Sequence, residues 1–474
     1  MRFSLPEKVN QVINGLKNAG FEAYAVGGCV RDLLLGRVPD DWDITTSATP
    51  TEVKGIFRRT FDTGIEHGTV TVMLGNDHFE VTTYRLDGKY SDNRHPDGVT
   101  FTRSLKEDLK RRDFTINALA YNEEDGIKDE FSGMEDLKNG IIRAVGDPSE
   151  RFKEDALRIL RAFRFSAQLD FRIEEKTCLA AVELKENLKN ISAERIQTEF
   201  TKLICSDHPE KIRQLYETGI TGIILPEIDI CFKTDQKNKH HMYNVGEHIM
   251  QALIADAGDI HKREAEYVSE DKWQEFLSTT DALDRECKIE DARAKKYIRY
   301  ALLFHDMGKP DCMTEDENGS RHFKGHALRS AEIAKDILNR LKVDNEMRHA
   351  VCELVKYHDY RPELSKKAVR RAMSRTGRDI YRLLIPIRLA DTLAQSSYKR
   401  AEKLDYEKGV MQAYMDIVKD GECVTVKELA VNGSDLIEHG IKEGPAIGKK
   451  LSDLLELVLE NPECNTKEYL LSKL

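Results

Sequence analysis

The periodicity of apolar residues changes once along this chain, and that change constrains the fold more than any other feature. Residues 21–85 contain short runs of strand type separated by turns, namely FEAYAVGG, TVTVML and HFEVTTYR. From about residue 148 the apolar positions recur with the period of a helix, as in SERFKEDALRILRAFRFSAQL. The 474 residues exceed what one core can organise. The sequence therefore predicts an α+β protein, with a mixed α/β domain around a small sheet up to about residue 140 and an all-α remainder.

Composition narrows the classes of protein to which the chain can belong. No apolar run reaches the roughly 18 residues that span a bilayer, and the N-terminus reads as an amphipathic helix with Val9, Val12, Ile13 and Leu16 on one face. The nine cysteines include no C-x-x-C pair, which favours a reducing cytoplasm. A net charge of −10 argues against a chain coated with nucleic acid, but it does not exclude a local basic groove. The charged stretch 256–293 has no dense apolar stripe and predicts a solvated insertion or mobile helices.

Two carboxylates follow a glycine turn near the N-terminus, in VGGCVRDLLLGRVPDDWDITT. Residues two apart on a strand point to the same face, so Asp41 and Asp43 converge if this segment is extended. Adjacent carboxylates repel each other, and Mg²⁺ relieves that repulsion while it binds phosphates. Glu80, in a neighbouring strand, could add a third carboxylate. A bare D-x-D pattern is common, so taken alone it favours a surface turn that carries two acids by chance.

The same stretch contains groups that suit a triphosphate. Gly27 and Gly28 allow close approach of the backbone, and Arg31 offers charge. Further along, the chain reads RRDFTINA at 111–118, EDALR at 154–158 and ISAERIQTE at 191–199. In this order, with G-G-x-V-R-D-x-L-L-G-R…D-x-D at 27–43, these segments resemble the class II branch of the DNA polymerase β nucleotidyltransferase superfamily. That branch contains the tRNA CCA-adding enzymes and the bacterial poly(A) polymerases.

The resemblance implies an activity, partners and a division into domains. It implies that Mg²⁺ on Asp41 and Asp43 activates an RNA 3′-hydroxyl towards a nucleoside triphosphate, and that Arg112 neutralises phosphate charge. The implied partners are tRNA, CTP and ATP, without a membrane. The implied domains are a nucleotidyltransferase head at 1–140, a helical neck at 141–205, a helical body at 206–400 and a helical tail at 401–474. The sequence makes no prediction of the oligomeric state.

An aspartate and an arginine in the neck suggest how the nucleotide is chosen without a template. Asp155 and Arg158 lie three residues apart on a predicted helix and would therefore be side by side. A carboxylate accepts from the amino group of cytosine or adenine and a guanidinium donates to the ring nitrogen, whereas uracil and guanine present the reverse order. Arg161 and Arg164 resemble further nucleotide contacts of the family. The alternative is an ordinary salt bridge on a helix surface.

Three activities of this branch have to be separated. Poly(A) polymerases typically carry G-R-R-F after the D-x-D, whereas this chain reads FRRTFDTGIEHGTVTVML, as CCA-adding enzymes do. Enzymes that add only cytidines tend to lack a loop before RRDF, and here DGKYSDNRHPDGV is present, with Asp92, Arg94 and Pro96. Complete C-C-A addition is favoured, with C-C-adding, A-adding and poly(A)-forming enzymes as alternatives.

A second set of motifs contains histidines. The segments KHHMYNVGEHIMQAL, LLFHDMGKP and IRLADTLAQSS resemble the HD metal-dependent phosphohydrolase superfamily at His248, His305, Asp306 and Asp391. His326 and His358 resemble the extra histidines that some members use for a second metal or for phosphate. The resemblance implies a second divalent transition metal and a phosphohydrolase activity. It also leaves an alternative of another class, in which this domain is the enzyme and the head has lost catalysis.

The C-terminal segment contains a glycine-rich helix start, GPAIGKK at 444–450. Gly444 and Gly448 would expose backbone N–H groups to phosphate, and Lys449 and Lys450 would add charge. The stretch resembles the family's RNA-binding tail, although a plain turn between helices has the same pattern. We predict that it contacts tRNA.

Overall fold

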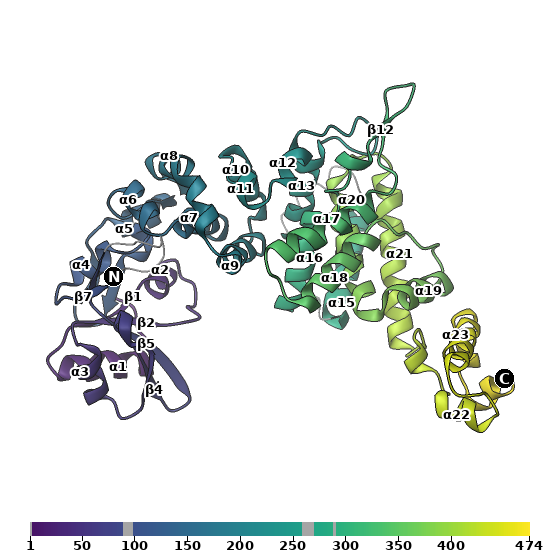
Figure 1. Cartoon of the computed structure of the whole chain (residues 1–474), viewed down its shortest axis with the longest axis horizontal. Helices are drawn as coiled ribbons and strands as arrows, with labels where there is room; N and C mark the ends of the chain where they lie inside the picture. Colours follow the sequence, from purple (N-terminus) through teal and green to yellow (C-terminus); the bar gives the residue numbers. More distant parts are fainter. Residues whose placement is uncertain (1, 89–97, 258–269, 288–290) are drawn as a thin grey trace. The chain divides into compact units, whose positions relative to one another are not determined.

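A computed structural model describes residues 2–88, 98–257, 270–287 and 291–474. The chain forms two compact units. The first comprises residues 1–203 and 214–224, and the second comprises residues 204–213 and 225–474 (Figure 1). The first unit holds most of the predicted head and neck, and the second holds most of the predicted body and tail. The finer division into four domains stays a prediction.

The first unit is built around a seven-stranded sheet, which confirms the predicted mixed α/β head. Its strand order is β3-β4-β5-β2-β1-β8-β9, and β2 and β5 are its parallel neighbours. The strands are β1 (Ala23–Val26), β2 (Asp43–Thr46), β3 (Thr60–Gly64), β4 (Thr69–Leu74), β5 (Asp77–Thr83), β8 (Leu119–Asn122) and β9 (Gly126–Asp129). Three two-stranded pairs join β6 (Arg85–Asp87) to β7 (Val99–Phe101), β10 (Ile141–Ile142) to β11 (Arg172–Ile173), and β12 (Thr314–Glu315) to β13 (Arg321–His322), the last pair in the second unit.

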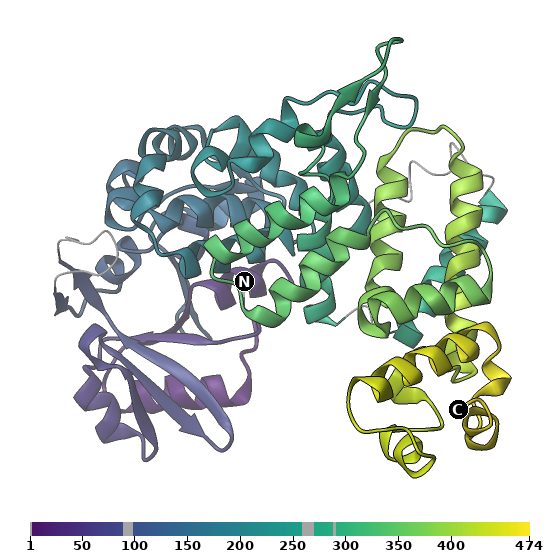
Figure 2. The same cartoon turned by 45° about the vertical axis from the view of Figure 1, so that its right-hand side comes forward.

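The core of the head follows from alternating side chains. Phe79, Val81 and Thr83 of β5 are buried while Glu80 is exposed, as their period of two predicts. Two helices, α1 (Glu7–Asn18) and α3 (Pro50–Ile56), pack side by side against the sheet (Figure 2). The first buries its predicted face, Val9, Val12, Ile13 and Leu16. A capping box between Thr49 and Glu52 starts α3.

The other helices of the first unit connect the head to the neck. They are α2 (Gly28–Leu34), α4 (Leu105–Lys110), α5 (Gly133–Asn139), α6 (Pro148–Glu154), α7 (Leu157–Leu169), α8 (Glu175–Leu184), α9 (Ala193–Ile204), α10 (Ile212–Glu217) and α11 (Thr221–Ile224). The last residue of α9 and the first two of α10 are assigned to the second unit. The prediction of one helix through residues 155–158 is wrong. Asp155 is extended, with φ −144° and ψ 104°, and separates α6 from α7. Its carboxylate accepts the Leu157 N–H at 3.0 Å, so it satisfies the first backbone donor of α7.

Among its described residues, the second unit is almost entirely helical, as predicted. Its helices are α12 (Glu227–Phe232), α13 (Val245–Ala257), α15 (Glu270–Cys287), α16 (Ala292–Phe304), α17 (His326–Arg340), α18 (Asn345–Tyr357), α19 (Lys366–Thr376), α20 (Arg378–Ala394), α21 (Arg400–Lys419), α22 (Gly433–Glu438), α23 (Pro445–Glu460) and α24 (Lys467–Leu471). In its centre α13, α16, α18 and α20 pack on one another. No helix among the described residues is long and apolar enough to cross a membrane.

The charged stretch 256–293 departs from its prediction where the structure describes it. Residues 270–287 form α15, which packs against α21 and buries Trp273 and Leu283 to 4% and 2% exposure. These two large apolar anchors, ten residues apart, attach a helix whose remaining residues are largely charged or polar. The idea of a purely solvated insertion is therefore wrong for this part. Residues 256–257 end α13, residues 291–293 are the N-cap and first two residues of α16, and 258–269 and 288–290 lie outside the described residues.

Candidate active site

The predicted carboxylates gather at one end of the parallel strand pair. Asp43 begins β2 and is paired in register with Glu80 of β5, and Asp41 stands two residues before the strand. All three side chains are exposed. Surrounding protein atoms raise the pKa of Asp43, the charge of Arg112 opposes this increase, and the negative charges of Glu80 and Asp41 add to it. The three carboxylates are therefore close enough to repel each other, which is the arrangement that a divalent cation relieves.

The glycine turn is shaped around an arginine. Gly27 has φ 85° and precedes α2, and a Cβ at this position would lie 2.9 Å from Nη1 of Arg112. Only glycine fits there, because a side chain would be strained and would displace the guanidinium. Burial lowers the pKa of Arg112, and the negative charges of Asp108 and Asp43 oppose that decrease. Its Nε has no hydrogen-bond partner among the described residues. A buried donor left without an acceptor next to acids suits an anionic ligand.

Arg31 is held in place by its neighbours. It forms a bidentate pair with Asp32 at 2.9 Å, donates to Asn117 at 2.7 Å, and lies 5.0 Å over the ring of Phe165. Asn117 in turn donates to Asp113 at 3.1 Å. The RRDFTINA segment thus acts largely as a scaffold that fixes the arginines around the turn.

Arg161 and Arg164, the predicted nucleotide contacts on α7, have protein partners. Arg161 donates to Asp113 at 2.8 Å. Arg164 is 7% exposed, pairs with Glu199 of α9 at 2.7 Å, and stacks 3.8 Å over Phe165. Both arginines therefore belong to a network that joins α7, α9 and the head, and a direct role in nucleotide binding stays a prediction.

The predicted base-reading pair is arranged differently from an ordinary i,i+3 salt bridge. Asp155 pairs with Arg195 of α9, whose Nη2 lies 2.7 Å from Oδ2. Arg158 pairs instead with Glu154 at 2.8 Å and donates to the carbonyl of Arg111 at 3.1 Å. The sequence analysis missed Arg195 and Glu199 as individual residues, although both lie in the ISAERIQTE segment that it singled out. The loop with Asp92, Arg94 and Pro96 lies outside the described residues.

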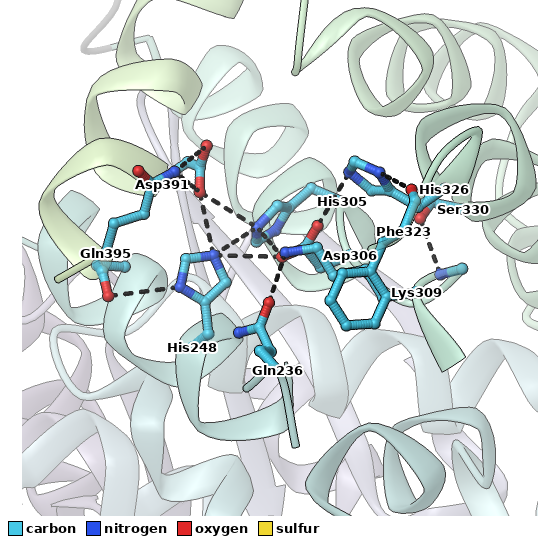
Figure 3. A network of polar contacts seen from close by, with 12 residues as sticks. Gln236, His248, His305, Asp306, Lys309, Phe323, His326, Ser330, Asp391 and Gln395 are labelled. Atoms are coloured by element: carbon cyan, nitrogen blue, oxygen red, sulfur yellow. Dashed lines mark hydrogen bonds and ion pairs between the residues drawn. The ribbon is translucent and has the colours of Figure 1, made fainter. Parts of the chain in front are cut away.

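The histidine motifs meet in one buried cluster of the second unit (Figure 3). Helices α13 and α20 contribute His248 and Asp391, and the turn after α16 contributes His305 and Asp306. His326 at the start of α17 and His358 just after α18 lie next to them. One oxygen of Asp306 is 3.3 Å from Nε2 of both His248 and His305, and the other is 3.3 Å from Nε2 of His326. Asp391 lies 3.0 Å from Nε2 of His248. The two Asp306 oxygens therefore face two separate histidine groups.

The histidine rings are oriented by backbone carbonyls. Nδ1 of His305, His326 and His358 lies 2.7, 2.9 and 2.7 Å from the carbonyl oxygens of Leu302, Phe323 and Val355, respectively. An N–H on Nδ1 that donates to a carbonyl leaves the Nε2 lone pair directed at the carboxylates, which is how metal-binding histidines are prepared. Burial opposes a proton on His248, but hydrogen bonds to Asp306 and Asp391 outweigh it and raise its pKa to about 8. Burial lowers the pKa of His358 to about 3.

A cavity of about 730 Å³ opens beside this cluster. Its lining includes Asp306, His326, His358 and Asp391 of the cluster. Basic side chains also line it, namely Lys239, His240, Lys309, Arg321, His322 and Lys324, together with the acids Asp316 and Asp359. Lys309 is buried, 2.7 Å from Asp306 and 2.8 Å from the side-chain oxygen of Gln236. The sequence analysis missed both residues. Lys309 was within reach, because it stands three residues after Asp306 in the HDMGK motif.

In the tail, the predicted helix start is present. Gly444 has φ 125° and precedes α23, which begins at Pro445. Gly448 and Lys449 are exposed, and Lys450 donates to the carbonyl of Lys473 at 2.7 Å. A role in binding RNA stays a prediction.

Comparisons with known proteins agree with the motif analysis. Three family models match: "Poly A polymerase head domain" at 23–143, "Probable RNA and SrmB- binding site of polymerase A" at 170–231, and tRNA nucleotidyltransferase domain 2 at 326–474. The head model belongs to a nucleotidyltransferase family and implies dependence on a divalent metal.

Individual relatives extend this result along the chain. A CCA-adding enzyme of Lactobacillus helveticus is 56% identical over 209 residues, 44% of this chain and 52% of that protein, so the chain matches about half the length of several curated relatives. The solved CCA-adding enzyme of Bacillus stearothermophilus in complex with CTP is 30% identical, with a TM-score of 0.66, over 99% of this chain and 97% of that one. A CCA-adding enzyme of Streptococcus suis is 34% identical over 461 residues, which cover 95% of this chain and 93% of that protein. The family resemblance is confirmed, and this chain belongs to the CCA-adding enzymes.

Proposed function

We propose that this protein adds C, C and A to the 3′ end of tRNA from CTP and ATP, without a template and with release of pyrophosphate. The observation that carries the proposal is the in-register pair of Asp43 and Glu80 on parallel strands, beside a Gly27 turn that only glycine can form. The CTP complex of the Bacillus stearothermophilus relative supports it. A tRNA substrate places the protein in the cytoplasm.

The head supplies the groups for nucleotidyl transfer. Asp41 and Asp43 would hold Mg²⁺, whose chemistry is to lower the pKa of the RNA 3′-hydroxyl and to stabilise the leaving pyrophosphate. Glu80 adds negative charge beside them, and its register with Asp43 fixes its distance along the sheet. The backbone at Gly28 and the guanidinium groups of Arg31 and Arg112 bind and orient the triphosphate.

The neck selects the base. Asp155 accepts a hydrogen bond from the exocyclic amino group of cytosine or adenine, and Arg158 donates to the adjacent ring nitrogen. Uracil and guanine would leave both groups mismatched, and a polar site penalises that strongly. Arg161 and Arg164, held by Asp113 and Glu199, fix the position of α7 and complete the positive wall of the nucleotide site.

The remaining segments serve the RNA. We assign the head to 1–140, the neck to 141–205, the body to 206–400 and the tail to 401–474. In the tail, the exposed N-terminus of α23 at Gly444 and Gly448, with Lys449 and Lys450, binds tRNA phosphates.

Incubation of the protein with tRNA that ends at the discriminator base tests this proposal. With CTP and ATP together, the product should carry C-C-A; with CTP alone it should stop after the cytidines. Homopolymeric adenosine would instead indicate a poly(A) polymerase, and addition of only one nucleotide type to the matching acceptor would indicate a C-C-adding or A-adding enzyme. No extension with any nucleotide would refute the proposal.

The histidine cluster favours a second activity, metal-dependent hydrolysis of phosphoesters. The side chains that converge here fit a divalent transition metal, namely those of His248, His305, Asp306 and Asp391. They are buried, and backbone carbonyls orient the two histidine rings. Asp306 offers its second oxygen to His326 and His358, which suits a second ion. The cavity lining mixes acids with cationic side chains, and Lys239, Lys309, Arg321 and Lys324 are the ones that could bind a phosphate group, such as one on a damaged RNA end.

Titration with Mn²⁺ followed by an assay on bis(p-nitrophenyl) phosphate tests this second activity. Binding of Mn²⁺ that is lost in Asp306→Asn, with hydrolysis that depends on the metal, would support it. If neither Mn²⁺ nor Ni²⁺ binds to the wild-type protein more tightly than to that variant, the cluster is structural.

A further inference from the structure

We propose that Arg195 is the positioning residue that holds the Asp155 carboxylate in the orientation required for base selection. This inference rests on the proposed nucleotide addition and adds a residue outside the segment that reads the base. Arg195 lies on α9, and its Nη2 donates to Oδ2 of Asp155 at 2.7 Å although the two residues are 40 positions apart in sequence.

The Asp155 carboxylate is held from two sides. Oδ1 accepts the backbone N–H of Leu157 at 3.0 Å, and Oδ2 accepts from Arg195. A carboxylate has about four acceptor positions on its two oxygens, so the amino group of a base can still be accepted. Without Arg195, a single backbone N–H would hold the group, and the terminal torsion of an aspartate is soft. The plane of the carboxylate would then no longer be fixed.

Other candidates for this role are engaged elsewhere. Arg158, the sequence neighbour, pairs with Glu154 and with a backbone carbonyl. Arg161 pairs with Asp113 at 2.6 Å and lies 3.6 Å from Glu199. Among the described residues, Arg195 forms a side-chain ion pair with Asp155. The position of the acid is therefore set from α9, and that of Arg158 from α6 and the head.

The hydrogen-bond donors of Arg195 are also not all paired within the described residues. Its Nη1 is buried and has no hydrogen-bond partner in the described part of the chain. Pairs that only stabilise a fold usually satisfy their buried donors, whereas exceptions concentrate at functional sites. The two sides of this pair are 23% and 16% exposed, so the pair lies at the edge of the interior, where a ligand can reach it. These observations favour orientation of Asp155 over mere stability.

Single-nucleotide incorporation distinguishes these roles. The variants are Arg195→Met, Arg195→Lys and, as a matched control, Arg172→Met, which removes an exposed arginine of β11. The measured quantity is the ratio of kcat/KM for CTP to that for UTP on tRNA without C-C-A, and for ATP to GTP on tRNA ending in C-C. We expect Arg195→Met to lower both ratios by about tenfold or more, because misplacing a recognition group by about 1 Å costs up to a hundredfold. Arg195→Lys should recover part of the ratio, and Arg172→Met should keep it.

The outcomes separate this inference from the proposed function. If the wild-type protein adds no nucleotide, the proposed function fails. If it adds C-C-A and Arg195→Met keeps wild-type ratios, with or without a lower melting temperature, the positioning role is refuted. Should Arg195→Met not fold, Arg195→Gln, which retains an N–H donor but no charge, decides in the same assay: wild-type ratios overturn the inference and lowered ratios support it.

Discussion

The two candidate sites of this chain are built in opposite ways. The head site consists of three exposed carboxylates at the end of a parallel strand pair, with a glycine turn and an arginine beside them. The histidine cluster is buried, and its side chains already contact one another at about 3 Å. The first site depends on its ions and substrate to neutralise its charge, whereas the second neutralises most of its own charge within the protein.

The difference reflects what each kind of site has to bind. An exposed set of repelling acids can accept a large triphosphate together with an RNA end, and the substrate contributes ligands to the metal. A buried set with oriented rings can hold a metal by protein atoms alone, and only the cavity beside it has to admit substrate. Independent disruption of the two sites tests whether they are separate.

The largest expected effect is the loss of extension in Asp41→Ala or Asp43→Ala. Either variant should lower the rate of C and A addition at least about a thousandfold, because a metal that stabilises charge at the reacting phosphate is lost. Gel analysis of extended tRNA measures it. Glu66→Gln, which removes an exposed acid of the same unit, should keep the activity. Extension that survives in both variants contradicts the metal assignment.

The reciprocal change is Asp306→Asn in the histidine cluster. Because Asp306 faces both histidine groups, its removal should weaken Mn²⁺ binding at least about a hundredfold, more than the loss of a supporting residue does. Calorimetric titration measures the affinity. Addition of C-C-A should stay within about twofold of wild type if the two sites act separately. A simultaneous loss of extension in a folded variant would show that they are coupled.

A tenfold effect is expected from Arg361, which supports the cluster from outside. Arg361 donates to the carbonyl of His358 at 2.7 Å and lies 3.5 Å from Asp391 and 3.3 Å from the buried Glu407. Arg361→Met should therefore weaken Mn²⁺ binding about tenfold, the lower end of the range for residues that orient ligands. Lys335→Met, an exposed change on α17, serves as the control. Wild-type affinity in Arg361→Met would assign Arg361 to stability alone.

The residues of the two sites could be predicted from the sequence in different ways. The strands of the head, the face of α1 and the convergence of Asp43 with Glu80 follow from periods of two and 3.6, which are local properties. The histidine ligands were predicted only from their resemblance to a known motif. Their positions, from 248 to 391, come together through the packing of several helices, which no local pattern contains. Local patterns also predicted Asp155 wrongly. The run around it is helical in composition, but Asp155 is extended and accepts the first N–H of the next helix. Partners such as Arg195 and Lys309 depend on tertiary contacts that no spacing rule contains.

The smallest effect concerns the stability of the head without metal. The pKa of Asp43 is raised by its surroundings and by Glu80 and Asp41, against the pull of Arg112. The folded protein therefore binds the proton more tightly than the unfolded chain does. The protonated carboxyl therefore stabilises the folded protein. This stabilisation is complete at a pH below the unfolded pKa of about 3.8 and is lost as the pH rises through the folded pKa. At pH 7 in a chelating buffer, Asp43→Asn should thus raise the melting temperature of the head.

The size of this increase is limited, because Asp43 is exposed and water screens the repulsion. We expect at most about 2 °C for a unit of this size, measured by calorimetry, and a smaller difference at lower pH, as the wild-type carboxyl protonates. Added Mg²⁺ should reverse the order, because the ion stabilises only the form that binds it. Glu66→Gln should show neither shift. If Asp43→Asn is destabilising without metal at pH 7, the carboxylates do not repel each other as the head site requires, and the contrast with the self-neutralised histidine cluster disappears.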